Sequence, residues 1–184
     1  MKKIMPQPKI MYELPPRAEP FTGLSIRSNC KNTEGAEQLF RSRFWNMKSV
    51  LQDETDGYPV YLNDTPSSVN DERLFREQGY VLHAQADRAE VYAAAKQGFA
   101  YAAAALKQLI SHAESGYAVD CAHIEDYPSV EVRGISIPFT WYAGYGRIGF
   151  DSQLWNFEQW KQFLDVCSDY RINQLNMVLY GFWP

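Results

Sequence analysis

Residues 79–110 decide the fold, and they read GYVLHAQADRAEVYAAAKQGFAYAAAALKQLI. Within them, residues 79–84 and 90–94 are mainly apolar and flank the polar connection Asp87-Arg88, as the two strands of an antiparallel hairpin do. From about Gly98 to Ile110, apolar residues recur at helical spacing, and the many alanines favour close packing. A helix on one face of an antiparallel sheet makes an α+β layer. We therefore predict an α+β fold, with helices packed on one face of an antiparallel sheet.

Shorter patterns on the N-terminal side extend this layer. Residues 24–27 alternate between apolar and polar types, which predicts a short strand with one buried face. Over residues 34–48 the apolar residues fall on one face after the possible N-cap residues Asn32 and Thr33, which predicts a helix. Residues 60–62 precede turn-forming residues and predict another strand.

The pattern changes near residue 124. Residues 125–128 predict a turn, and residues 130–138 predict a strand. A helix of about 15 residues follows, and residues 172–180 then predict a last strand. Possible N-cap residues of this helix are Asp151, Ser152 and Asn156. A strand, a helix and a strand joined by a crossover form a right-handed parallel unit.

We place a domain boundary at this change, with an accessory α+β domain at residues 1–123 and a second domain at residues 124–184. A two-stranded parallel sheet leaves both edges open and its apolar faces uncovered, whereas parallel sheets are normally buried on both faces. The second domain is therefore expected to be incomplete. We expect either that the chain is the front end of a longer protein or that this unit docks on the first layer.

The distribution of charge excludes some classes of partner. The 18 basic and 22 acidic residues give a net charge of −4, and they show no cluster of Lys and Arg of the kind that binds nucleic acid. The most apolar stretch, residues 91–110, is interrupted by Lys96 and Lys107 and is too short for a membrane helix. We expect no nucleic-acid partner and no membrane partner.

The N-terminus and the cysteines bear on the compartment. Lys2 and Lys3 resemble the start of a secretory signal, but Pro6 and Pro8 interrupt the segment before an apolar run forms. The three cysteines show no CxxC spacing and leave one thiol unpaired in any disulfide scheme; they are Cys30, Cys121 and Cys167. We expect a soluble cytoplasmic protein with reduced cysteines.

An aromatic segment follows the strand predicted at residues 130–138. It contains Trp141, Tyr142 and Tyr145 at the carboxyl end of a predicted parallel strand, where α/β and barrel enzymes place their sites. Aromatic rings bordered by polar groups suit the C–H faces and hydroxyls of sugars. We predict that Trp141, Tyr142 and Tyr145 bind a saccharide substrate; Arg147 and Trp155 lie in or beside the same segment. For any single ring, the alternative is that it covers the junction of strand and helix.

The same segment contains a glycine pattern. Residues 144–149 read GYGRIG, which matches the GxGxxG pattern of dinucleotide-binding turns. In that fold the turn directly follows the strand and the third glycine lies in the helix. Here residues 139–143 intervene, and the best helix cap comes after Gly149. We interpret the glycines as a loop that needs positive φ angles, and we keep a nucleotide-binding oxidoreductase as an alternative.

Other catalytic patterns are missing from the sequence. His83, His112 and His123 show no metal-ligand spacing, and we interpret them as separate structural histidines. No GxSxG, HExxH or phosphate-loop pattern occurs. The acidic pair Glu125-Asp126 precedes the predicted strand, so we interpret it as part of a turn rather than as the carboxylate pair of a glycosidase. We expect no metal and no cofactor.

The order of these segments resembles glycoside hydrolase family 20, the β-N-acetylhexosaminidases. Residues 77–82, 91–94 and 98–109 are similar to the accessory α+β domain that precedes the catalytic barrel in that family. Asp126-Tyr127-Pro128 and Arg133-Gly134 are similar to the signature that joins this domain to the first barrel strand. The resemblance covers roughly residues 60–184, and related accessory domains occur in glycoside hydrolase families 84 and 67.

The resemblance implies that residues 124–184 begin a (β/α)8 barrel. It implies that Arg133 binds hydroxyls of the terminal sugar, a task that a planar guanidinium suits, and that the catalytic carboxylates lie beyond Pro184. We therefore expect the N-terminal segment of a β-N-acetylhexosaminidase-like glycosidase, inactive alone, with a glycoside substrate and the rest of the barrel in the same polypeptide. The alternative is a non-catalytic carbohydrate-binding or scaffold module.

Overall fold

The computed structural model describes residues 4–15, 19–51, 57–65, 72–139 and 155–179. Contacts divide the chain into two compact units, Met1–Ser129 (unit 1) and Val130–Pro184 (unit 2). Among the described residues, no helix has the length and apolar character needed to span a membrane.

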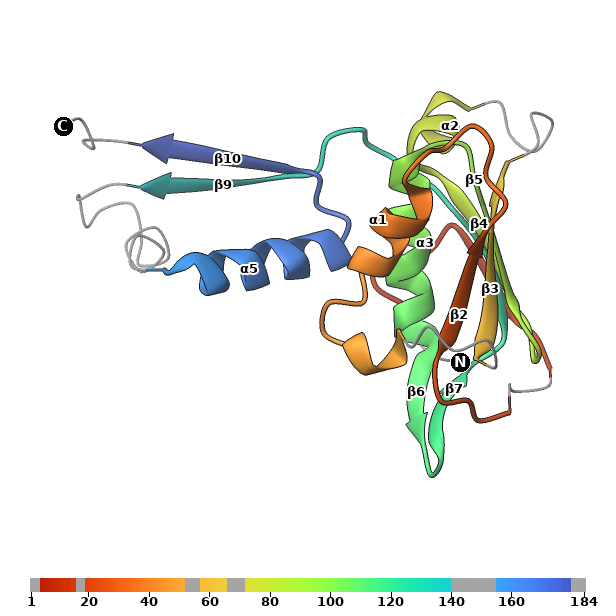
Figure 1. The fold of residues 1–184 in the computed structure, drawn as a ribbon. Coiled ribbons are helices and arrows are strands. Elements are labelled where there is room, and N and C mark those ends of the chain that lie inside the picture. The colour runs from red at the N-terminus through yellow and green to blue at the C-terminus, as the bar shows by residue number, and fades with distance from the viewer. Residues whose placement is uncertain (1–3, 16–18, 52–56, 66–71, 140–154, 180–184) are drawn as a thin grey trace. The chain divides into compact units, whose positions relative to one another are not determined.

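Unit 1 contains a six-stranded sheet in the order β1-β8-β4-β5-β3-β2. Figure 1 labels β2, β3, β4 and β5 of this sheet. The strands are β1 (Ile10–Glu13), β2 (Leu24–Ser28), β3 (Tyr58–Asp64), β4 (Tyr80–Ala84), β5 (Ala89–Ala93) and β8 (Ala122–Asp126). Pairing is antiparallel from β1 through β8 and β4 to β5. It is parallel from β5 through β3 to β2.

The sheet is therefore mixed, which corrects the predicted antiparallel sheet. Between β2 and β3 the chain passes through helix α1 (Ala36–Ser42). Such a crossover returns the chain to the same end of the sheet, so the two strands run parallel. The α+β class itself is confirmed.

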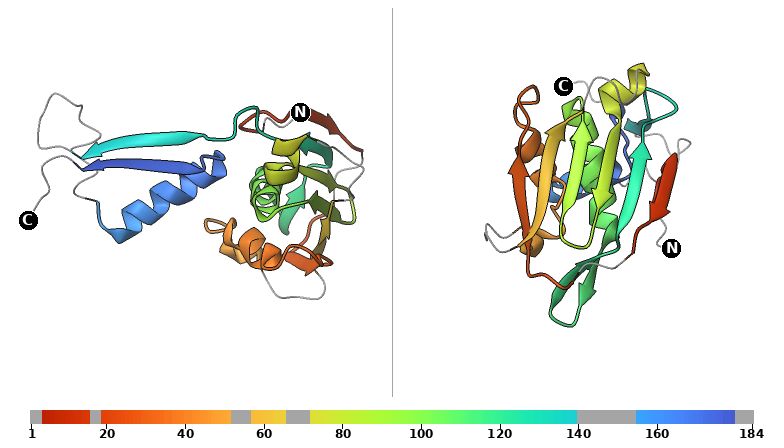
Figure 2. Two further views of the ribbon diagram at one scale, coloured as in Figure 1. Left: turned by 90° about the horizontal axis from the view of Figure 1, so that it is seen from above. Right: turned by 90° about the vertical axis from the view of Figure 1, so that its right-hand side faces the viewer.

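Helices cover one face of this sheet (Figure 2). The longest is α3 (Lys96–Leu109), which contacts β4, β5 and α1, and the short helix α2 (Arg73–Gln78) also packs on α3. A hairpin of β6 (Ile110–Ala113) and β7 (Gly116–Val119) follows α3 directly. The other face of the sheet carries no described helix, so it presents alternate side chains of the strands.

The hairpin β4–β5 and helix α3 confirm the pattern of residues 79–110. Leu82 of β4 and Phe99 of α3 are fully buried in one core. α3 approaches β4 closely at Gly98, where a Cβ would lie 2.1 Å from the carbonyl oxygen of Gly79. Only a residue without a side chain fits this contact.

Some short elements differ from the sequence expectation. The helix predicted at residues 34–48 is limited to α1, and a 3₁₀ turn at Lys48–Val50 follows it. No sequence pattern predicts β1, whose Ile10 and Tyr12 are about half exposed. An edge strand of four residues with exposed side chains has too weak an alternation to be recognised from sequence.

Strand β8 extends past the predicted domain boundary. The boundary between residues 123 and 124 falls inside β8, which pairs with β4 as far as Asp126. Asp126 is buried, and its Oδ1 accepts a hydrogen bond from the backbone N–H of Lys9 at 3.2 Å. The division between the units comes after Ser129 instead. Glu125 and Asp126 are strand residues, which corrects their interpretation as a turn.

Unit 2 consists of a strand, a helix and a strand: β9 (Gly134–Phe139), α5 (Phe157–Asp169) and β10 (Gln174–Leu179). The two strands are parallel, as predicted, with Gly134 beside Gln174 at the start of the ladder. β9 begins four residues later than the predicted strand at 130–138. The four residues before it carry the exposed side chains of Val130 and Val132.

The N-terminus of α5 has a capping box. The Oδ1 atom of Asn156 accepts from the backbone N–H of Gln159 at 3.0 Å, and the Gln159 Oε1 atom accepts from the backbone N–H of Asn156 at 2.9 Å. Two unsatisfied donors of the first turn are paired in this way. Of the three predicted caps, Asn156 is confirmed, while Asp151 and Ser152 lie outside the described residues.

Candidate functional site

The carboxyl ends of β9 and β10 lie at the same edge of unit 2, because the strands are parallel. In α/β proteins this edge is where ligands bind. From β9 the chain continues into residues 140–154, which contain Trp141, Tyr142 and Tyr145 and the glycine pattern at 144–149. These residues lie outside the described part of the chain, so their substrate contacts remain predictions.

Arg133 lies at the opposite end of β9, directly before Gly134. Its Nε donates to the carbonyl of Arg171 at 2.8 Å, and its Nη1 donates to the carbonyls of Val130 at 2.7 Å and Glu131 at 3.1 Å. The guanidinium therefore ties the segment before β9 to the segment before β10.

Asn173 makes two further hydrogen bonds between the segment before β9 and the segment before β10. Its Oδ1 accepts from the backbone N–H of Arg133 at 2.8 Å, and its Nδ2 donates to the carbonyl of Glu131 at 2.8 Å. Arg171, two residues before Asn173, has a φ of 62°. The backbone N–H of the next residue, Ile172, donates to the carbonyl of Cys167 at 2.9 Å, and this hydrogen bond closes the end of α5. The left-handed Arg171 turns the chain from α5 into β10.

The length of β9 separates Arg133 from the carboxyl edge of the two strands. A strand of six residues spans about 20 Å at roughly 3.3 Å per residue. The described hydrogen bonds place Arg133 at the amino end of the strand and give it a structural role. Its contact with a sugar remains a prediction.

Three described aromatic residues of unit 2, Trp155, Trp160 and Phe163, pack against one another. The ring centroid of Trp155 lies 4.9 Å from that of Trp160 and 5.3 Å from that of Phe163. Phe157, at the first turn of α5, is 77% exposed. Through these contacts with Trp160 and Phe163, Trp155 covers the start of α5. This is the structural alternative to sugar binding for a ring near the junction of strand and helix.

Two of the described thiols, those of Cys30 and Cys167, are poor nucleophiles. Burial raises the pKa of Cys30 and also that of Cys167 above the ordinary thiol value. A thiolate is needed for attack, and burial in apolar surroundings disfavours it. Neither cysteine therefore suggests covalent catalysis.

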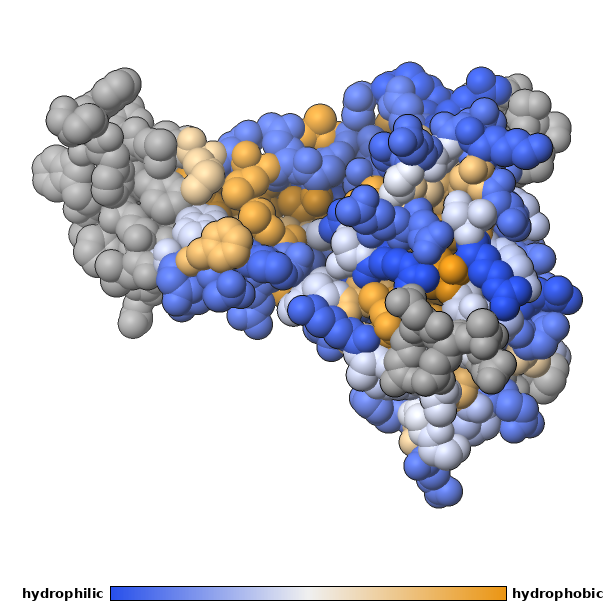
Figure 3. All heavy atoms as spheres, in the orientation of Figure 1, coloured by the Kyte–Doolittle hydropathy of each residue, from blue (hydrophilic) through white to orange (hydrophobic). Residues whose placement is uncertain are grey.

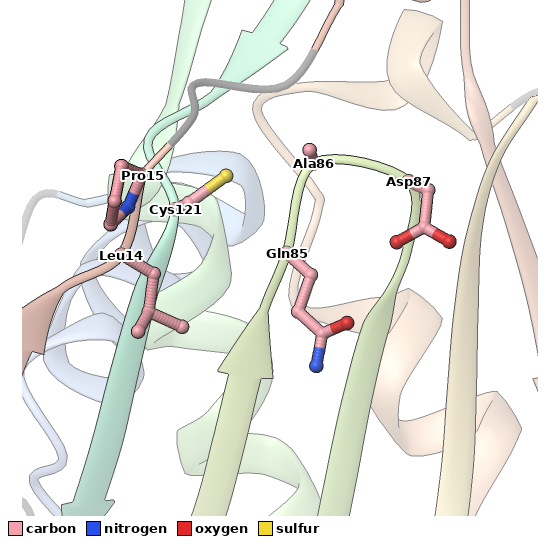
Figure 4. A pocket seen from close by; sticks show the side chains of 6 residues that line it. All are labelled: Leu14, Pro15, Gln85, Ala86, Asp87 and Cys121. Carbon is pink, nitrogen blue, oxygen red and sulfur yellow. The ribbon is translucent and has the colours of Figure 1, made fainter.

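Unit 1 has a hollow of about 320 Å³ at one end of its sheet (Figure 4). It is lined by Leu14, Pro15, Gln85, Ala86, Asp87 and Cys121. The carbonyl of Gln85 accepts from the Tyr58 hydroxyl at 2.7 Å, and burial raises the pKa of Tyr58 well above its usual range. With one carboxylate among its described lining residues, this hollow lacks the pair of acidic groups that glycoside hydrolysis uses.

Two of the histidines form a pair that no sequence motif predicts. The Nδ1 atoms of His83 and His123 lie 3.0 Å apart. The interpretation of these two as separate histidines is therefore wrong. They are 40 residues apart in sequence, and only the register of β4 beside β8 brings them together.

Comparison with protein families identifies the chain. Residues 2–127 match the family described as glycosyl hydrolase family 20, domain 2. The chain belongs to glycosyl hydrolase family 20. The match ends one residue after β8, so it covers the mixed sheet and the helices of unit 1. No curated protein matches the chain.

Solved structures resemble this family 20 chain over 95% or more of its length. An exo-β-N-acetylglucosaminidase from Vibrio harveyi in complex with N-acetylglucosamine has a TM-score of 0.70 at 16% identity, covering 96% of this chain and 25% of that one. A β-N-acetylhexosaminidase from Bacteroides fragilis has a TM-score of 0.68 at 20% identity, covering 96% and 33%. A protein named CpGH84B has a TM-score of 0.62 at 19% identity, covering 95% and 29%.

These similarities show a shared fold that includes unit 2. They confirm the resemblance to family 20, and the name CpGH84B agrees with the expected relation to family 84. The family 20 chain spans only about a quarter to a third of the length of these structures.

Proposed function

We propose that the protein carrying this chain is a β-N-acetylhexosaminidase, which releases terminal N-acetylhexosamine residues from glycosides. The observation that carries the proposal is the match of residues 2–127 to family 20. The fold shared with an enzyme that holds N-acetylglucosamine supports it. Unit 1 acts as the accessory domain, and unit 2 contributes to the substrate site.

Unit 2 is, in this proposal, the first strand, helix and second strand of a (β/α)8 barrel. Apolar side chains exposed on it support this (Figure 3); they include Phe157, Leu164, Val166, Tyr170 and Met177. Parallel sheets are stable when both faces are covered. The covering elements would be later strands and helices of the same polypeptide, and the catalytic carboxylates would come from them.

The substrate contacts of this chain come from the segment after β9. Trp141, Tyr142 and Tyr145 supply rings for the C–H faces of the sugar, at the edge where barrel enzymes bind their substrates. For Arg133, the bonds to three backbone carbonyls support a positioning role, in which it fixes the start of β9 beside the start of β10. A direct bond from Arg133 to a sugar hydroxyl is the alternative role.

We also propose a reducing compartment for the protein. Cys30, Cys121 and Cys167 are all free thiols, and disulfides are rare where thiols are kept reduced. Alkylation of the protein in fresh cell extract, followed by peptide mapping, would detect Cys30, Cys121 and Cys167 as reactive thiols after unfolding, and detection of one of them in a disulfide would contradict this placement.

Hydrolysis of p-nitrophenyl N-acetyl-β-D-glucosaminide tests the proposed activity. We expect release of p-nitrophenol by the protein that carries this chain, and none from p-nitrophenyl β-D-glucoside, which lacks the acetamido group. The 184-residue chain by itself should show no turnover. Binding of N-acetylglucosamine by the whole protein without hydrolysis of either substrate would favour the non-catalytic binding module instead.

A further inference from the structure

The open face of the unit 1 sheet carries a continuous row of cross-strand neighbours. Each residue of the row lies opposite the next in the strand register. From β1 to β2 the row is Tyr12, His123, His83, Glu90, Tyr61 and Arg27. The two histidines therefore occupy the middle of the sheet, where the backbone is held by strands on both sides.

The two imidazoles are held in place by rings around them. Tyr12 stacks on His123 with ring centroids 4.6 Å apart, and Tyr92 meets His83 edge to face at 6.1 Å. Between them, the Nδ1 atoms of His83 and His123 face each other at 3.0 Å. This contact needs one of the two Nδ1 atoms to carry a proton, while the other accepts.

The surroundings of the pair favour a cation. The histidines lie in a hollow of about 530 Å³ whose lining includes Glu90 and Glu125. Among the described residues that line it, there is no lysine or arginine. Glu90 lies opposite His83, and Glu125 is two residues beyond His123 on the same strand. Two carboxylates, with no basic side chain among the described lining residues, favour a cation in this hollow.

We propose that His83 and His123 form a binding site for a divalent transition metal ion of the Ni²⁺ or Cu²⁺ type, with both Nδ1 atoms as ligands. Imidazole nitrogen binds such metals at about 2.0 Å. Two ligands at that distance and 3.0 Å apart subtend about 95° at the metal. This is close to the adjacent positions of a square-planar or octahedral ion, whereas a tetrahedral Zn²⁺ site needs roughly 3.3 Å between its nitrogens.

Water completes the coordination in this proposal. The described part of the chain contains no group of three or more His, Cys, Asp or Glu side chains placed to hold a metal together. Glu90 and Glu125 therefore act as acceptors for the metal-bound waters, a contact that strengthens a site without direct ligation. Metal binding requires both rings as the Nε2–H tautomer, so the proton between the Nδ1 atoms moves to an Nε2 atom.

Titration with NiCl₂ tests the site. Isothermal titration of the whole protein at pH 7.5, prepared without a histidine tag, should show a saturable Ni²⁺ site that requires His83 and His123. His83→Gln and His123→Gln should each weaken binding by tenfold or more. His112→Gln is the matched control, because His112 lies on β6 against Tyr117, away from the pair, and it should bind as the unchanged protein does.

A second measurement guards against variants that fail to fold. The electron paramagnetic resonance spectrum of the unchanged protein with one equivalent of Cu²⁺ should show coupling to two imidazole nitrogens. Absence of saturable Ni²⁺ binding would overturn the proposal and leave the pair as a hydrogen bond alone. Equal Ni²⁺ affinity in His83→Gln, His123→Gln and the control, or a Cu²⁺ spectrum without two nitrogens, would also overturn it.

Discussion

Replacing Arg133 by methionine separates its two possible roles. The change keeps most of the aliphatic stem and removes three hydrogen bonds to the carbonyls of Arg171, Val130 and Glu131. A hydrogen bond of this kind contributes about 1 kcal/mol net when it is partly exposed. Arg133→Met should therefore reduce the free energy of unfolding by about 2–3 kcal/mol, and it should leave the KM for a chromogenic N-acetylglucosaminide within about twofold of its original value.

The assay is urea unfolding of the whole protein, combined with steady-state kinetics. Asn173→Ala should also lower the free energy of unfolding, by about 1–2 kcal/mol, because Asn173 makes two hydrogen bonds to the segment before β9. Arg88→Met is the matched control: Arg88 is exposed and its ion pair with Asp87 spans 3.4 Å, so its loss should cost less than about 0.5 kcal/mol.

An opposite result would refute the positioning role of Arg133. If Arg133→Met leaves stability unchanged and raises KM by tenfold or more, the guanidinium binds the sugar directly. A hydrogen bond from a charged group to a buried hydroxyl is worth about 1.5–3 kcal/mol, which corresponds to a change of that size.

Three further variants test the fold and the site. Gly98→Ala should destabilise by about 1–3 kcal/mol or more, since its Cβ would lie 2.1 Å from the Gly79 carbonyl oxygen; Gly134→Ala, whose Cβ would meet nothing closer than 3.6 Å, is the control in thermal unfolding, and equal effects would contradict the close contact. His123 has a pKa below the ordinary 6.5, so the folded state binds fewer protons than the unfolded state, and stability should fall as the pH drops below about 6.5. In urea titrations from pH 7.5 to 5, His123→Gln should reduce the dependence of the unfolding free energy on pH. An unchanged dependence would contradict the lowered pKa of His123. Trp141→Ala should raise KM by about tenfold if its ring packs on the sugar, whereas unchanged kinetics would remove Trp141 from the substrate site.

The local pattern of residues 79–110 is sufficient to predict a hairpin and a helix, because both elements form from neighbours in sequence. The parallel pairing of β3 with β2 and β5 is not local. It depends on which strand edge remains available after the crossover through α1, and the periodicity of the sequence does not indicate which strands pair. This is why the class was predictable while the direction of two strand pairs was not.

The end of β8 shows how a distant partner changes the meaning of a polar residue. From sequence, Asp126 is predicted to lie in an exposed turn, because a buried carboxylate is unfavourable without a hydrogen bond. In the folded chain the backbone N–H of Lys9 supplies one, from 117 residues away. The strand therefore continues three residues past the predicted boundary.

The candidate site was predictable only where it depends on residues that are neighbours in sequence. The parallel unit and its capped helix follow from sequence, and they locate the edge at which residues 140–154 begin. The sequence pattern places the start of β9 four residues too early and so makes Arg133 an interior strand residue, whereas Arg133 lies before the strand. The pairing of His83 with His123 depends on the register of β4 and β8, and residue spacing along the chain carries no sign of it.

A crystal structure of the whole protein with N-acetylglucosamine bound tests the central claim most directly. The account predicts that β9 and β10 are adjacent strands of a closed parallel barrel, and that the sugar lies at their carboxyl edge against at least one of Trp141, Tyr142 and Tyr145. A unit 2 sheet that closes in another architecture, or a sugar bound elsewhere with that edge covered by protein, would contradict it.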